Sequence, residues 1–112
     1  MEPNFRVYVL FEKGKPEQIR YVGYTKWPVE KRLYFHVKSV SYDKTSYKSK
    51  WIRSVLKRSN EIETKMLFDG LTESEAKHKE IEVIAEFRSK GYKLTNGTNG
   101  GDGLSMPTQE TI

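Results

Sequence analysis

Residues 6–23 have the sequence RVYVLFEKGKPEQIRYVG, which predicts two antiparallel β-strands joined by a turn. The β-branched and aromatic side chains at both ends of this stretch favour extended backbone, and the glycine and proline between them favour a turn. A hairpin centred between Gly14 and Lys15 would place Tyr8 directly opposite Tyr21. Both phenol rings are therefore expected on the same face of the sheet.

Two helices are predicted after this hairpin, because apolar residues recur three and four positions apart. The first is expected to be capped by Thr25, to take Pro28 into its first turn and to end near Val40. The second is expected to be capped by Ser46 and to end near Lys57.

The same spacing predicts which side chains face the core. In the second helix, Leu56 is expected to point inward and Lys48 outward. Residues 62–68 alternate in polarity and predict a third strand, which would face the core with Met66 and Phe68 among others.

A third helix over residues 72–90 completes the predicted fold, because Thr72 and Glu75 have the spacing of a capping box. The elements then follow the order β-β-α-α-β-α. We therefore expect an α+β fold in which helices flank a small three-stranded antiparallel sheet. Residues 1–103 are expected to form this single domain, and residues 104–112 a flexible C-terminal tail.

Glu80 falls in the middle of the apolar stripe of this third helix, one turn after Ala76 and one turn before Ile84. Burying a carboxylate without a partner is strongly unfavourable, so a bound cation is a natural candidate for that partner. The chain has no Cys and only two His, and a carboxylate ligand favours Mg²⁺ or Mn²⁺ over zinc.

The composition excludes several classes of protein. The absence of Cys excludes disulfides and thiolate metal sites. No apolar run is long enough to span a membrane, so no membrane partner is expected. The N-terminus lacks the basic start and apolar core of a signal peptide, and a cytoplasmic location is expected.

Positive charge is concentrated in the middle of the chain. The net charge is +5 overall, whereas residues 26–58 hold ten basic and two acidic side chains, a net charge of +8. Such a region favours a polyanionic partner such as nucleic acid. The candidate nucleic-acid-binding side chains are Lys26, Lys38, Lys44, Lys48, Lys50 and Arg53.

The order of these features resembles that of the GIY-YIG nuclease superfamily, as a small stand-alone nuclease or as the catalytic domain of a homing endonuclease. The segment Val7-Tyr8-Val9 is similar to the first strand motif of the family, although it lacks the Gly and Ile of the name, and Tyr21-Val22-Gly23 is similar to the second. The family then has an Arg and a His on its first helix, a Glu on a later helix and an Asn after that helix. These are matched by Arg32, His36, Glu80 and Asn96.

This resemblance implies a metal-dependent DNA endonuclease that hydrolyses phosphodiester bonds, with Mg²⁺ or Mn²⁺ bound by Glu80. Its catalytic residues would be Tyr8, Tyr21, Arg32, His36, Glu80 and Asn96. Arg32 would hold phosphate oxygens, and either Tyr8 or His36 would accept the proton of the attacking water. Gly23 is expected to leave the sheet surface clear for the phosphate.

Other functions are compatible with the same sequence. The protein could be a catalytically inactive nucleic-acid-binding module of this fold, or a nuclease directed at RNA. Since the chain has one candidate metal site, cutting both strands of duplex DNA would require two copies, possible as a homodimer on the DNA.

Overall fold

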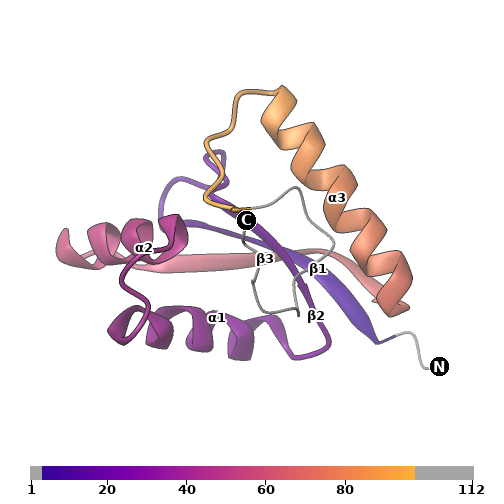
Figure 1. Ribbon diagram of the computed structural model, residues 1–112, viewed down its shortest axis with the longest axis horizontal. Coiled ribbons are helices and arrows are strands. Elements are labelled where there is room, and N and C mark those ends of the chain that lie inside the picture. The colour runs from indigo at the N-terminus through magenta and orange to yellow at the C-terminus, as the bar shows by residue number, and fades with distance from the viewer. Residues whose placement is uncertain (1–3, 98–112) are drawn as a thin grey trace.

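A three-stranded antiparallel sheet in the order β2-β1-β3 runs through the molecule (Figure 1). The computed structural model describes residues 4–97, so the predicted domain boundary at residue 103 and the tail lie outside the described residues. The strands are β1 (Phe5–Glu12), β2 (Tyr21–Thr25) and β3 (Ile62–Leu71). The helices are α1 (Val29–Lys38), a short 3₁₀ turn η1 (Ser39–Ser41), α2 (Tyr47–Lys57) and α3 (Glu73–Ser89). The predicted α+β class and element order are confirmed.

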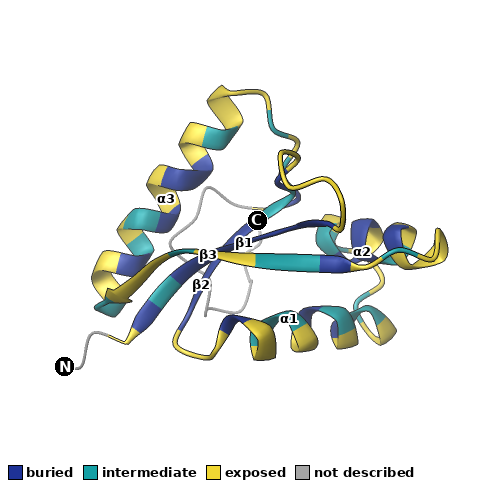
Figure 2. Ribbon diagram, turned by 180° about the vertical axis from the view of Figure 1, so that it is seen from behind, coloured by how far each residue is buried: buried dark blue, intermediate teal, exposed yellow. Residues whose placement is uncertain are grey.

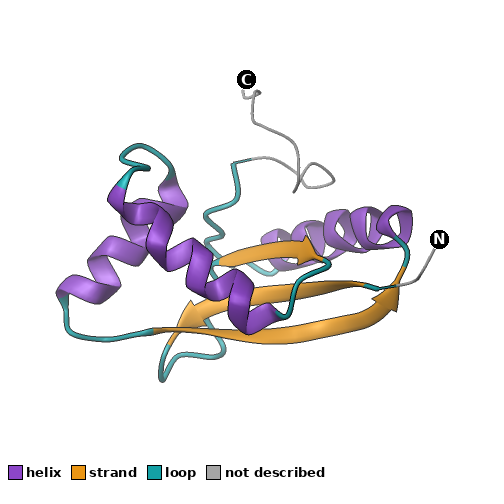
Figure 3. Cartoon of the chain, turned by 90° about the horizontal axis from the view of Figure 1, so that it is seen from below, coloured by secondary structure: helices purple, strands orange, loops and turns teal. Residues whose placement is uncertain are grey.

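Helices cover both faces of the sheet. Figures 1 and 3 show α1 and α2 on one face and α3 on the other. The central strand β1 is buried along nearly its whole length (Figure 2), and its alternate residues supply two separate cores. Tyr8 and Leu10 pack with residues of α1 and α2, whereas Val7 and Val9 pack with residues of α3. Among residues 4–97, no helix has both the length and the apolar character that crossing a bilayer requires.

The predicted hairpin register is wrong by two residues. Tyr8 lies opposite Gly23, and Tyr21 lies opposite Leu10. The connection between β1 and β2 is longer than the symmetrical turn that was expected. It begins with a turn in which Lys15 N–H donates to the Glu12 carbonyl. A shift of two residues preserves the face of every side chain, so Tyr8 and Tyr21 still share a face, with ring centroids 6.4 Å apart.

The predicted inward face of β3 is also wrong in part. Met66 and Phe68 are 43% and 40% exposed. The pairing between β1 and β3 contains irregularities, one of which gives β3 an extra residue, Leu67, between the partners of Val7 and Tyr8. Leu67 consequently packs against the α3 core, and its neighbours turn toward solvent.

Two of the three predicted helix caps are confirmed. The Ser46 hydroxyl accepts a hydrogen bond from the backbone N–H of Ser49, and Thr72 forms a capping box with Glu75. Thr25 does not cap α1. Its hydroxyl instead accepts a bond from Trp27 N–H at 3.0 Å, because the chain turns before α1 begins.

The inward face of α2 is narrower than predicted. Its buried residues include Trp51, Ile52 and Val55, and Leu56 is 40% exposed on the flank of that stripe. An inward position for Leu56 was therefore wrong.

A buried carboxylate at the end of β1 gives a prediction on stability. Glu12 accepts hydrogen bonds from Arg58 at 2.6 Å and from Asn60 at 2.8 Å. These bonds, Arg58 first and Asn60 second, lower the pKa of Glu12 to about 2. The resulting stabilisation is present above the ordinary carboxyl pKa of 4.5 and is lost as the pH falls through about 2.

Glu12→Gln is therefore expected to lower the free energy of unfolding by about 2 kcal/mol at neutral pH, measured by urea denaturation. The difference from wild type should shrink as the pH falls from about 4 toward 2. Glu61→Gln is the matched control, since Glu61 is 73% exposed and lies 4.0 Å from Lys13. Equal stability of the Glu12→Gln variant and wild type at neutral pH would contradict this role of Glu12.

Candidate active site

A buried pair formed by Tyr8 of β1 and His36 of α1 lies at the centre of the candidate site. The Tyr8 hydroxyl and His36 Nε2 are 2.7 Å apart, and each residue is 1% exposed. His36 Nδ1 is buried and has no hydrogen-bond partner among the described residues. The contact with Tyr8 is therefore the only hydrogen bond that the His36 ring makes among the described residues.

Both members of this pair are neutral at neutral pH. Burial, followed by the charge of Tyr21, raises the pKa of Tyr8 well above its usual value, and Arg32 opposes this shift. Burial, followed by the charges of Lys48 and Arg32, lowers the pKa of His36 well below its usual value. A neutral imidazole accepts the phenolic proton when its own hydrogen is on Nδ1, and donates to the phenol when that hydrogen is on Nε2.

Tyr21 and Lys48 lie beside this pair. The half-buried Tyr21 ring meets the His36 ring edge-on at 5.0 Å between centroids, and Lys48 Nζ lies 5.6 Å from the centre of the Tyr21 ring. The outward position predicted for Lys48 is wrong, because α2 turns this side chain toward the site. The spacing along the helix indicates this inward direction, because Lys48 precedes the buried residues Trp51 and Ile52 by three and four positions.

Arg32 adds a second cation to the site. It is half-buried on α1, one turn before His36, and its Nε has no hydrogen-bond partner among the described residues. Burial and then the charge of Arg32 lower the pKa of Lys48 to about 8. An anion in contact with both Arg32 and Lys48 would relieve their repulsion, so the arrangement suits a phosphate group.

Gly23 makes room for Tyr8. A Cβ at Gly23 would lie 2.6 Å from the Tyr8 hydroxyl oxygen and 2.8 Å from Cζ, distances that side-chain atoms do not tolerate. The expectation that Gly23 leaves an open surface for phosphate is therefore wrong, because the Tyr8 ring occupies that space.

Glu80 is buried as predicted, with 2% exposure, on the stripe of α3 that includes Ala76 and Ile84. However, α3 packs against the face of the sheet opposite to α1 and α2. The charge of Glu80 raises the pKa of Tyr8, but it is the weakest of the influences on that group, after burial and the two neighbours Tyr21 and Arg32. Helix α3, which carries Glu80, thus covers the other face of the sheet from α1, while the charge of Glu80 still acts on Tyr8.

The donors available to a metal ion are few. Among residues 4–97, no three His, Asp or Glu side chains form a group that could hold a metal ion. A single buried carboxylate is nevertheless chemically suited to Mg²⁺, which keeps several water ligands and binds substrate phosphate. Glu80 is the residue that would hold it.

Asn96 fixes the edge of β2 that faces away from β1. Its side chain accepts a hydrogen bond from Val22 N–H at 3.0 Å and donates one to the Val22 carbonyl at 2.7 Å. Thr95 adds two bonds to the Arg20 carbonyl through its N–H and its hydroxyl. Because both ends of its amide are engaged with Val22, Asn96 positions the strand that carries Tyr21.

The predicted nucleic-acid-binding cations divide into three groups. Arg53 donates to the carbonyls of Val40 and Asp43 at 2.9 and 2.7 Å, so it holds the loop before α2. Lys48 belongs to the site described above. The other four are exposed: Lys26, Lys38, Lys44 and Lys50.

The low pKa of Lys48 gives a prediction on pH dependence. Lys48 is charged below about pH 8 and neutral above it, so affinity for DNA is expected to fall as the pH rises through this value. The loss of one phosphate contact should weaken binding about fivefold, corresponding to about 1 kcal/mol, as measured by fluorescence anisotropy between pH 7 and 9.5 without divalent ions.

Lys48→Arg is expected to abolish this fall, because a guanidinium stays charged throughout that range. Lys50→Arg, on the exposed side of α2, should keep the wild-type pH dependence. An identical profile for wild type and Lys48→Arg would remove Lys48 from the anion-binding site.

Similarity to known proteins gives no independent indication of function. Comparisons of the chain with protein-family models, with curated proteins and with solved structures found no match.

Proposed function

We propose that the protein is a metal-dependent endonuclease that hydrolyses phosphodiester bonds in DNA. The observation that carries this proposal is the buried 2.7 Å contact between Tyr8 and His36, which lies beside the cations Arg32 and Lys48. Phosphodiester hydrolysis needs a proton acceptor for water and positive charge beside the phosphate, and this group supplies both.

Each side chain has a distinct task in the proposed reaction. Arg32 grips two phosphate oxygens and neutralises the charge that develops on them. The Tyr8 hydroxyl receives a proton from the attacking water and passes its own proton to His36 Nε2. Alternatively, His36 accepts the proton without the phenol. A Mg²⁺ or Mn²⁺ ion held by Glu80 would supply further neutralisation of the phosphate charge.

The distribution of charge supports DNA as the partner. Residues 26–58, which include α1 and α2, carry a net charge of +8, and the candidate site lies under these helices. Such a surface attracts the phosphate backbone without reading its sequence. One reaction centre per chain nicks one strand, and two copies meeting on the duplex would cut both. A DNA substrate accords with a cytoplasmic protein.

The decisive experiment is nicking of supercoiled plasmid with Mg²⁺, with Mn²⁺ and with EDTA. Wild type is expected to nick with either metal and not with EDTA. Glu80→Gln should nick about 100-fold more slowly and still bind DNA, since it removes the metal ligand and keeps the shape of the side chain. Glu82→Gln, on the exposed face of α3, is the matched control and should retain wild-type nicking. The proposal would be contradicted if wild type failed to nick at any metal concentration, or if nicking were undiminished in EDTA.

A second candidate is a nucleic-acid-binding module without catalysis. It is favoured by the placement of α3, the helix that carries Glu80, on the face of the sheet opposite to α1, the helix that carries His36. This function predicts DNA binding that survives Glu80→Gln and no cleavage under any condition. Competition between matched DNA and RNA strands in the same assays would identify an RNA-directed nuclease.

A further inference from the structure

A second, basic groove lies next to the candidate active site, between the start of β2, α2 and the chain that follows α3. Its volume is about 430 Å³, within the range of small-ligand sites. It is lined by three cationic side chains and two aromatic rings, and no described lining residue is acidic. These side chains are Arg20, Lys50, Lys93, Tyr47 and Trp51.

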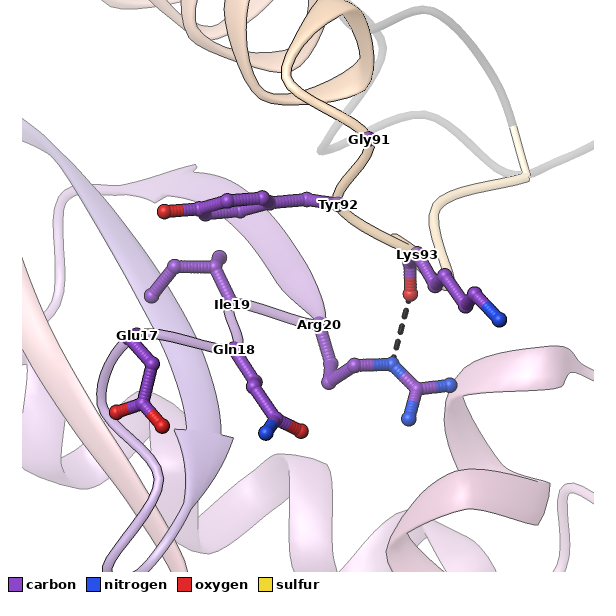
Figure 4. Close-up of a pocket in the computed structure, with 7 residues that line it drawn as sticks. All are labelled: Glu17, Gln18, Ile19, Arg20, Gly91, Tyr92 and Lys93. Atoms are coloured by element: carbon purple, nitrogen blue, oxygen red, sulfur yellow. Dashed lines mark hydrogen bonds between the residues drawn. The ribbon is translucent and has the colours of Figure 1, made fainter.

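Arg20 is held in place at the inner wall of this groove. Its Nε donates to the Lys93 carbonyl at 2.7 Å, and its guanidinium lies 5.5 Å from the centre of the Trp51 ring. Figure 4 shows an adjoining cavity of about 320 Å³, where the Arg20 side chain extends toward α2. The guanidinium is therefore fixed by protein contacts before any ligand arrives, which lowers the entropy lost on binding.

Tyr47 forms the outer wall. It is 69% exposed, and Lys50 Nζ lies 5.9 Å from the centre of its ring. An exposed ring beside a cation is the usual platform for stacking a nucleic-acid base while the cation contacts the adjacent phosphate.

The groove is continuous along the chain with the candidate active site. Arg20 precedes Tyr21 and Tyr47 precedes Lys48, and Trp51 of the groove packs in the same core cluster as Tyr8 and Tyr21. A polymer whose phosphate binds near Tyr21 and Lys48 would therefore carry its neighbouring nucleotide into this groove.

We propose that the groove binds one unpaired nucleotide of a DNA strand. The phosphate contacts Arg20, Lys50 and Lys93, and the base stacks on Tyr47. An unpaired nucleotide is required because a base inside a duplex already has neighbouring bases on both faces. This inference rests on the proposed nuclease function and specifies its substrate as DNA with a single-stranded tail, flap or gap.

The test is fluorescence anisotropy with a blunt duplex and with the same duplex carrying an unpaired tail, both in EDTA. Wild type is expected to bind the tailed DNA about tenfold more tightly. Tyr47→Ala should remove most of this preference and leave blunt-duplex affinity unchanged, because one stacked base contributes about 1–3 kcal/mol. Lys93→Ala should weaken binding of tailed DNA and reduce its salt dependence by about one unit of slope.

Matched controls exist for both variants. Tyr42→Ala removes another exposed tyrosine, and Lys65→Ala removes an exposed cation on β3; both should behave as wild type. Lys93→Ala keeps the backbone carbonyl that holds Arg20, so loss of binding cannot be assigned to that contact. Equal affinity of wild type for tailed and blunt DNA, or equal effects of Tyr47→Ala and Tyr42→Ala, would overturn the proposal.

The assay in EDTA also separates this proposal from the nuclease function. A preference for tailed DNA without nicking in Mg²⁺ would support the groove and remove the nuclease. Nicking without a preference for tailed DNA would support the nuclease function and contradict the proposed role of the groove.

Discussion

Arg32→Ala is expected to reduce DNA nicking by about 1,000-fold or more, with little loss of stability. The proposed role of Arg32 is to neutralise charge that develops on the phosphate, and removing such a group has effects of this size in phosphoryl-transfer sites. The loss of stability should be small, because Arg32→Ala removes a hydrogen bond with Tyr8 but also removes a charge that repels that of Lys48. Single-turnover nicking and thermal unfolding measure the two effects.

Two companion variants sharpen this prediction. Arg32→Lys keeps the charge but loses the bidentate hydrogen bonding to phosphate, so it should recover only part of the wild-type nicking rate. Lys31→Ala removes the adjacent exposed cation, which lies over the Trp27 ring at 4.6 Å, and should nick like wild type within about threefold. Nicking by Arg32→Ala within tenfold of wild type would show that Arg32 does not act on the phosphate.

Arg32→Ala should also raise the pKa of Lys48 from about 8, because one of the causes of its depression is removed. The pH at which DNA affinity begins to fall would move upward accordingly. A pKa change of this kind depends on proximity of the two charges, so it tests whether Arg32 and Lys48 lie together as one cationic site.

Gly23→Ala is expected to lower the free energy of unfolding by about 3 kcal/mol, because its methyl group would overlap the Tyr8 ring. That ring is buried and hydrogen-bonded to His36, so it has little room to move. Gly97→Ala is the control, since a Cβ there meets nothing within 4 Å. Urea denaturation gives the free energies.

The cause of this loss can be isolated with a double variant. When Tyr8→Leu has already removed the ring, adding Gly23→Ala should be much less damaging than in wild type. Additive effects of Tyr8→Leu and Gly23→Ala would show that the two positions do not oppose each other.

Much of the fold could be predicted because its signals are local. The caps at Ser46 and Thr72 depend on residues three positions away, and the order of strands and helices follows from hydrophobic spacing. The hairpin register depended on the turn, whose hydrogen bonds are not encoded by a simple spacing. The outward turn of Met66 depends on an irregularity in the pairing of β3 with β1, which only the assembled sheet reveals.

In the candidate site, too, the features with local signals could be predicted, and those that depend on the assembled fold could not. The common direction of Arg32 and His36 follows from their separation of one helical turn, and the burial of Glu80 follows from its place on an apolar stripe. Which face of the sheet α3 would cover could not be deduced, because it depends on the path of the chain after β3. The inward turn of Lys48 was detectable from its spacing to Trp51, but a lysine among basic residues suggested a solvent-exposed position.

The two hydrogen bonds between the Asn96 side chain and Val22 of β2 have a consequence for folding during synthesis on the ribosome. The amide side chain holds Val22, a residue that leaves the ribosome 74 positions earlier. The strand that carries Tyr21 therefore lacks this support until nearly all of the described chain has emerged. A chain translated only as far as β3 would hold its reactive groups in unfinished surroundings, which would delay any hydrolytic activity until Asn96 has emerged.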